Sequence, residues 1–89
     1  MRPNHRRHRR YNVAQGGRIA RADGASLGTC LVLDISASGA RLEMKTPDAV
    51  PDSFVLLLSR DGLVRRQCVV AWRSEVAIGV EFIPIDPAI

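Results

Sequence analysis

The residues best suited to chemistry begin with a cluster of arginines near the start of the chain. Residues 1–10 (MRPNHRRHRR) contain five arginines and no acid, whereas the remaining residues have eight basic against nine acidic side chains. Arg6 and Arg10 form an R-x-x-x-R pair, and planar guanidinium groups bind phosphate oxygens or the O6/N7 edge of guanine through paired hydrogen bonds. Taken alone, the run also fits a solvated basic tail or a nonspecific nucleic-acid contact.

A second candidate site is the D-x-S-x-x-G motif formed by Asp34, Ser36 and Gly39. An aspartate accepts hydrogen bonds from the N1–H and N2 amino group of guanine, and a serine hydroxyl binds phosphate or base. Glycine permits a tight turn and a close approach to the backbone. The same residues also fit an Asx or Ser turn that closes a β-hairpin, without any ligand.

The elements that must position these residues are short strands. We predict strands because β-branched and other apolar residues gather in runs bounded by turn signals. The predicted strands are RIARA (18–22), GTCLVLDIS (28–36), ARLEMK (40–45), FVLLLS (54–59), RRQCVVAWR (65–73) and AIGVEF (77–82). Gly16–Gly17 and Asp23–Gly24 are predicted turns around the first strand. Residues 46–52 are a predicted loop with one helical turn.

The pattern within these strands predicts an all-β fold. Ala40, Leu42 and Met44 alternate with charged residues, as in a strand with one buried face. Ile78, Val80 and Phe82 are expected to share the inner face of the last strand. Six strands with short connections and little helix predict a six-stranded antiparallel β-barrel, because closure removes exposed edges. We expect residues 1–12 to form a flexible arginine-rich ligand-binding segment and residues 13–89 to form the barrel.

Several classes of protein are not supported by the sequence. It has no G-x-S-x-G, no H-E-x-x-H and no glycine-rich phosphate loop before a helix, so we do not expect an enzyme. Cys30 and Cys68 lie in separate apolar runs and form no C-x-x-C pair, so we expect no metal site and no cofactor. The sequence has neither an apolar run long enough to span a bilayer nor a secretory signal, so we expect a cytoplasmic protein without membrane insertion.

Taken together, the two motifs and their order resemble the PilZ domain family. The arginine pair precedes the first strand, and D-x-S-x-x-G follows at a strand end. VVAWR (69–73) and IGVEF (78–82) are similar to the family's late strand with its tryptophan and to the G-V-x-F strand after it. The resemblance covers roughly residues 5–83. Many members carry a C-terminal helix for which the residues up to Ile89 leave no room.

This resemblance implies a receptor domain for the bacterial second messenger cyclic di-GMP. By analogy, Arg6 and Arg10 would hold phosphates and the guanine O6/N7 edge, and Asp34 would bind the N1/N2 edge. Ser36 would hydrogen-bond nearby, and Gly39 would keep the surface open. The N-terminal segment would order around the nucleotide. His5, just before the arginine pair, leaves open whether one or two nucleotides bind.

Other residues have weaker claims on the site. Arg7 and Arg9 are candidates for further phosphate contacts or for solvated charge. Trp72 is predicted to pack in the core with Cys68 and Val70, although in the family a tryptophan here can line the site. Arg41, Arg65, Arg66 and Arg73 are predicted surface residues, any of which could lie near the ligand.

Three functions therefore remain open on the sequence alone. The first is a cyclic di-GMP receptor that signals to an unidentified effector protein, as a monomer or weak dimer. The second is a PilZ-type protein-interaction module that binds no nucleotide. The third is a small basic β-barrel that binds nucleic acid, which the few aromatic residues in the strands disfavour.

Overall fold

A computed structural model describes residues 11–84, which form six strands and one short 3-10 helix. The elements occur in the following order: β1 (Tyr11–Ala20), β2 (Ser26–Ile35), β3 (Gly39–Glu43), the 3-10 helix η1 (Pro47–Ala49), β4 (Ser53–Leu57), β5 (Arg65–Arg73) and β6 (Ala77–Phe82). β5 and β6 have the predicted bounds, and the helical turn falls within the predicted loop. The predictions that fall on residues 1–10 and 85–89 lie outside the described part of the chain.

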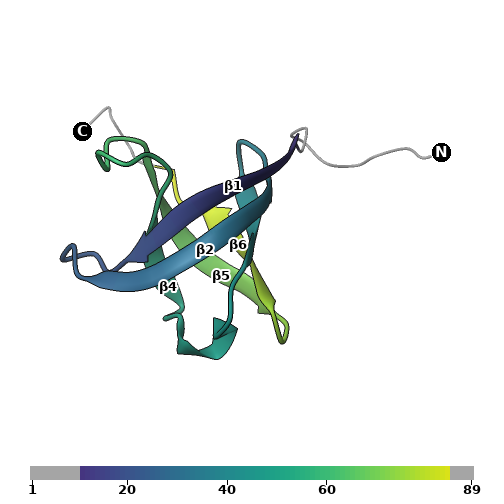
Figure 1. Ribbon diagram of the computed structural model, residues 1–89. Coiled ribbons are helices and arrows are strands. Elements are labelled where there is room, and N and C mark those ends of the chain that lie inside the picture. Colours follow the sequence, from purple (N-terminus) through teal and green to yellow (C-terminus); the bar gives the residue numbers. More distant parts are fainter. Residues whose placement is uncertain (1–10, 85–89) are drawn as a thin grey trace.

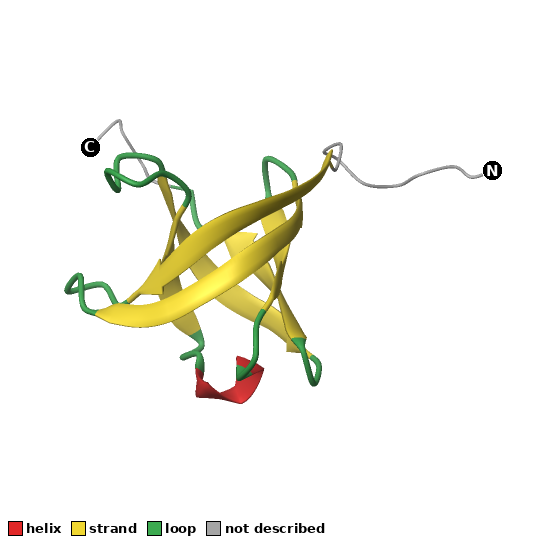
Figure 2. Ribbon diagram, viewed as in Figure 1, coloured by secondary structure: helices red, strands yellow, loops and turns green. Residues whose placement is uncertain are grey.

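The strands close into an antiparallel barrel in the order β1-β2-β3-β6-β5-β4, with β4 paired to β1 (Figure 1). The predicted six-stranded barrel is therefore confirmed. Colouring by secondary structure shows that strand dominates the described chain and that η1 lies at one end of the barrel (Figure 2). No helix within residues 11–84 is long and apolar enough to cross a membrane.

One apolar core fills the barrel and receives side chains from every strand. Its largest fully buried side chains are Phe54, Leu42, Leu56, Ile78, Val32 and Cys68. The predicted alternation in β3 is confirmed, because Ala40 and Leu42 are buried whereas Arg41 and Glu43 are exposed. In β6, Ile78 and Val80 are buried as predicted.

The first strand is longer than predicted, and the predicted turn at Gly16–Gly17 is wrong. Both glycines lie inside β1, where they pair with Leu31 and Cys30 of β2. A side chain at position 17 would contact the core side chains of Cys30, Leu56 and Val32, so glycine suits a strand that crosses close over the core. Tyr11 and Asn12, expected in the N-terminal segment, also belong to β1.

Candidate functional site

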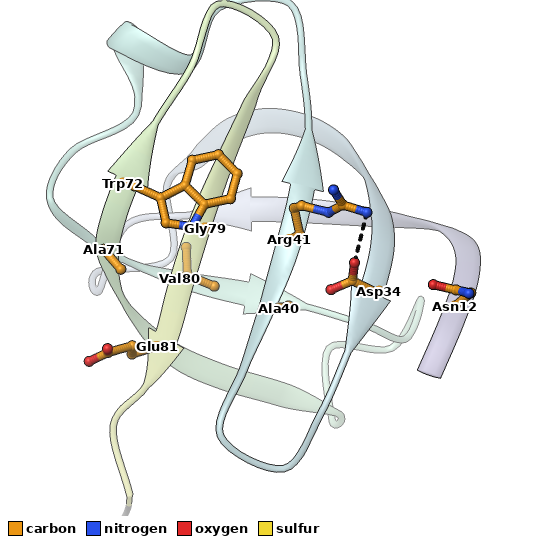
Figure 3. Close-up of a pocket in the computed structure, with 9 residues that line it drawn as sticks. All are labelled: Asn12, Asp34, Ala40, Arg41, Ala71, Trp72, Gly79, Val80 and Glu81. Atoms are coloured by element: carbon orange, nitrogen blue, oxygen red, sulfur yellow. Dashed lines mark ion pairs between the residues drawn. The ribbon is translucent and has the colours of Figure 1, made fainter. Parts of the chain in front are cut away.

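Five residues from five strands form a continuous row across the outer wall of the barrel. Asn12 pairs with Asp34, Asp34 with Arg41, Arg41 with Gly79, and Gly79 with Trp72, which joins β1, β2, β3, β6 and β5. The row runs along a surface hollow of about 600 Å³. Figure 3 shows the residues that line it: Asn12, Asp34, Ala40, Arg41, Ala71, Trp72, Gly79, Val80 and Glu81.

Three breaks in strand register turn this row outward. The pairing shifts between Asn12 and Gln15 in β1, between Val32 and Asp34 in β2, and between Val70 and Trp72 in β5. Such an irregularity adds a residue to one strand and so reverses the face on which the following side chain lies. Without these shifts, strict alternation would put Asp34 on the same face as Val32, inside the barrel.

Asp34 lies in the wall of the hollow, close to the start of β1. Its exposed fraction is only 6%, yet its carboxylate lines the hollow and forms an ion pair with Arg41. Nη2 of Arg41 is 2.9 Å from Oδ2 of Asp34 (Figure 3). The carboxylate is thus held by a cation in a partly desolvated position, where hydrogen bonds are stronger than in water.

Trp72 lies on the outer wall, so its predicted place in the core is wrong. Val70 pairs with Val80 and Trp72 pairs with Gly79, which leaves Ala71 as the extra residue of β5. The indole is 46% exposed and lines the hollow. It packs so closely over Gly79 that a side chain at that position would overlap the indole ring. The alternative prediction, that Trp72 lines the site, agrees with this position.

Ser36 closes the turn between β2 and β3. Its exposed fraction is 8%, and its backbone N–H donates to the carbonyl of Gly39 at 2.8 Å. Its hydroxyl oxygen accepts a hydrogen bond from the backbone N–H of Ser38 at 3.2 Å. These bonds form a serine-based turn, which was the ligand-free interpretation of this part of the motif. Ser36 is not among the residues that line the hollow.

Gly39 is buried where β3 meets β6. A Cβ atom at this position would overlap the carbonyl oxygen of Val80 and contact the backbone of Glu81. The absence of a side chain therefore allows a neighbouring strand to approach closely. From the sequence we expected the missing side chain of Gly39 to let a ligand approach the backbone. In the structure it lets the adjacent strand β6 approach instead.

The described chain also contains site residues that the sequence prediction did not single out. Arg41, Asn12 and Glu81 all line the hollow. A signal for Arg41 was present in the sequence. A tight hairpin centred on the D-x-S-x-x-G turn pairs residue 35 with 40 and residue 34 with 41, so Arg41 falls opposite Asp34. Arg6, Arg7, Arg9 and Arg10 lie outside the described residues.

No group of three or more histidine, cysteine, aspartate or glutamate side chains is placed to hold a metal ion within residues 11–84. Cys30 and Cys68 are free thiols that project into the core. Burial raises the pKa of Cys30 to about 11 and that of Cys68 to about 12. Both side chains are therefore protonated near neutral pH.

The family model for the PilZ domain matches residues 4–89, which is nearly the whole chain, and the chain belongs to this family. PilZ domains are receptors for cyclic di-GMP and act as binding and adaptor domains, not as enzymes. A search of curated proteins found no match.

Proposed function

We propose that this PilZ domain binds cyclic di-GMP in the hollow and signals its presence to a partner protein. Arg6 and Arg10 bind phosphates and the guanine O6/N7 edge, and Asp34 binds the guanine N1/N2 edge. The observation that carries the proposal is the pairing of Asn12 with Asp34, because it puts the guanine-binding acid beside the strand that the arginine segment directly precedes.

Chain connectivity supports the approach of the arginines to the hollow. Tyr11 pairs with Ile35, the residue after Asp34. Arg10 directly precedes Tyr11, and Arg6 precedes it by five residues, a stretch that spans at most about 18 Å when extended. Both arginines can therefore reach the hollow without any rearrangement of the barrel.

The charge distribution supports different roles for the two motifs, with Asp34 binding the base and the arginine segment binding the phosphates. Asp34 and Glu81 line the hollow together with one described cation, Arg41. Cyclic di-GMP carries two phosphate charges, so the wall alone, with two acids against one arginine, would repel it more than attract it. The five arginines of residues 1–10 supply the missing cations, and Arg7 and Arg9 are available for further phosphate contacts.

Trp72 supports the binding of a planar base. Its indole lines the hollow across β6 from Arg41, where a guanine could stack on it. Stacking of a base on an aromatic side chain contributes about 1–3 kcal/mol in proteins that bind single-stranded nucleic acid. One tryptophan gives a place for a base without forming the multi-aromatic platform that such proteins use.

In this proposal the main role of Ser36 and Gly39 is to shape the hairpin that holds Asp34 in the hollow. The Ser36 hydroxyl has partners in Ser38 and Gly39, so a hydrogen bond to the ligand would require it to share or exchange them. Ordering of the arginine segment around the nucleotide costs conformational entropy, which the charge-assisted hydrogen bonds must exceed. The newly ordered surface is what a partner protein would recognise.

Calorimetric titration with cyclic di-GMP, GTP and a short single-stranded oligonucleotide tests this function. We expect saturable binding of cyclic di-GMP alone, weakened at least about tenfold, or about 1.4 kcal/mol, by Arg10→Ala and by Asp34→Asn. Asp34→Asn retains the side-chain shape, and Asp23→Asn is a matched control, because Asp23 is also paired with an arginine but is exposed and away from the hollow.

Each alternative predicts a different titration. Equal binding of the oligonucleotide would favour a nucleic-acid-binding barrel. Absence of binding to all three ligands would favour a PilZ-type interaction module that has no nucleotide ligand. An equal loss of affinity in Asp34→Asn and Asp23→Asn would contradict the assignment of the site.

A further inference from the structure

The ion pair between Arg41 and Asp34 is part of the hollow itself. The two residues are direct cross-strand partners in β3 and β2, and both side chains line the hollow. The side chain of Arg41 is half exposed, whereas that of Asp34 is almost fully covered. A planar ligand that reaches the Asp34 carboxylate must therefore also meet the Arg41 guanidinium.

The hydrogen-bonding pattern of this pair complements guanine. The Watson–Crick edge of guanine presents an acceptor, O6, followed by two donors, N1–H and the N2 amino group. A guanidinium beside a carboxylate presents a donor followed by two acceptors, which is the order that cytosine offers in a base pair. The carboxylate alone would match only the two donors.

We infer that Arg41 and Asp34 bind guanine as one unit, in which Arg41 donates to O6 while Asp34 accepts from N1–H and N2. This inference rests on the proposed function, since it concerns the same hollow and the same ligand. It assigns a direct part in base specificity to Arg41, which the sequence predicted only as a surface residue that could lie near the ligand.

The capacity of both groups allows this arrangement without loss of the ion pair. A guanidinium has five N–H donors, and the contact with Oδ2 of Asp34 engages Nη2. An ionised carboxylate only accepts hydrogen bonds and has about four acceptor positions, so an ion pair and contacts with a base are of a kind that one carboxylate can share. The charge-assisted pair also keeps Asp34 oriented before the ligand arrives.

The missing side chain of the β6 residue opposite Arg41 brings the indole of Trp72 close to Arg41. Its partner in β6 is Gly79, and the next residue of the row is Trp72. The indole of Trp72 covers Gly79, so that Arg41 and the indole are neighbours along the row, as Figure 3 shows. A purine that stacks on the indole would present its edge toward Arg41 and Asp34.

This unit predicts rejection of adenine. Adenine carries an amino donor at the position of O6 and an acceptor at N1, so Arg41 would face a donor and Asp34 an acceptor. Sites built to hydrogen-bond a ligand reject analogues that leave their buried polar groups unpaired. Cyclic di-AMP should therefore bind much more weakly than cyclic di-GMP.

The test is a chemical double-mutant cycle that separates the O6 contact from the N2 contact. Wild type and Arg41→Met are titrated with cyclic di-GMP, with its 6-thioguanine analogue, which replaces O6, and with its inosine analogue, which lacks the N2 amino group. Arg21→Met is the matched control, because Arg21 is an exposed, ion-paired arginine away from the hollow.

We expect wild type to bind the 6-thio analogue about tenfold or more weakly than cyclic di-GMP, as for the loss of one good contact to a base edge. In Arg41→Met, cyclic di-GMP should bind about tenfold more weakly, and the penalty for the 6-thio substitution should shrink to the part that the contacts of Arg6 and Arg10 with O6 leave. The penalty for the inosine analogue should persist, because Asp34 is intact.

An unchanged affinity of Arg41→Met for cyclic di-GMP, or an undiminished 6-thio penalty in that variant, would overturn the role of Arg41 and leave the proposed function standing. Failure of wild type to bind cyclic di-GMP would overturn both. If Arg41→Met fails to fold, as judged by circular dichroism, Arg41→Gln replaces it. Because the shorter amide side chain cannot reach a base beyond Asp34, the same reduction of the 6-thio penalty is expected.

Discussion

At the scale of single residues, Gly39 and Asp34 show how the same motif combines structure with chemistry. Gly39 lets β6 pass close to β3, and Asp34 faces the hollow beside Arg41. Ser36 connects them through the hydrogen bonds of the turn. The motif therefore builds the hairpin and supplies the proposed guanine contact with different residues.

The prediction at this scale concerns Gly39. In Gly39→Ala the new methyl group would overlap the backbone of Val80, which cannot move as a flexible side chain can. We expect a loss of about 1–3 kcal/mol in the free energy of unfolding, the usual cost of overpacking. Urea unfolding measures this loss.

Gly16→Ala is the control for Gly39→Ala. Gly16 also lies in a strand, has no positive φ angle, and has no atom within 4 Å of the position that an alanine methyl group would take. The stability of this variant should stay within about 0.5 kcal/mol of wild type or rise slightly. Equal destabilisation by both substitutions would show that the contact with Val80 is not the cause.

At the scale of the elements, the irregularities of three strands decide which side chains reach the hollow. β1, β2 and β5 each shift register just beside a residue of the row, namely Asn12, Asp34 and Trp72. β-bulges re-aim side chains in this way and are common next to functional sites. The irregular positions of these strands are therefore part of the site.

The bulge of β1 gives a prediction, because Ala14 within it has a φ angle of 61°. A β-branched residue tolerates this left-handed conformation poorly, so Ala14→Val should lower the free energy of unfolding by about 1–2 kcal/mol. Ala14→Gly should not lower it, since glycine adopts positive φ without strain. Thermal or urea unfolding of the two variants would reveal the difference, and equal stabilities would contradict a strained Ala14.

At the scale of the whole molecule, one core supports both the closed barrel and its outer hollow. β4 completes the barrel by pairing with β1 through three residue pairs, and the core beneath contains Cys30 from β2 and Cys68 from β5. A chain of 89 residues buries a limited core, so each buried group matters to its stability.

The two thiols predict how the stability of this core depends on pH. Their pKa values are raised by burial from 9.0 to about 11 and about 12, so the folded state retains protons that the unfolded state releases above pH 9. The stabilising contribution is complete below pH 9 and is lost as the pH rises through the folded-state values. The free energy of unfolding should therefore fall between pH 9 and the folded-state values.

Urea unfolding at pH 8 and pH 10 would measure this fall, with Cys30→Ala/Cys68→Ala as the control variant. The control removes the two titrating groups, so its decrease between the two pH values should be smaller than that of wild type. Identical decreases would assign the pH dependence to other groups.

The sequence alone determined the class of fold, the bounds of β5 and β6, and the alternation in β3. These follow from local composition and a period of two, which neighbouring strands do not alter. The sequence also indicated Asp34 as a site residue, because the D-x-S-x-x-G motif and the arginine pair occur together in the PilZ family.

Only the tertiary structure decided the direction of Trp72, the course of β1 through Gly16–Gly17 and the reason for glycine at position 39. Each depends on a second strand: a register shift against β6, a crossing over the core, or a backbone in close contact. A bulge is a mismatch between two paired strands, so the pattern of one strand does not contain it. Mismatches of this kind in three strands lie beside Asn12, Asp34 and Trp72, which line the hollow.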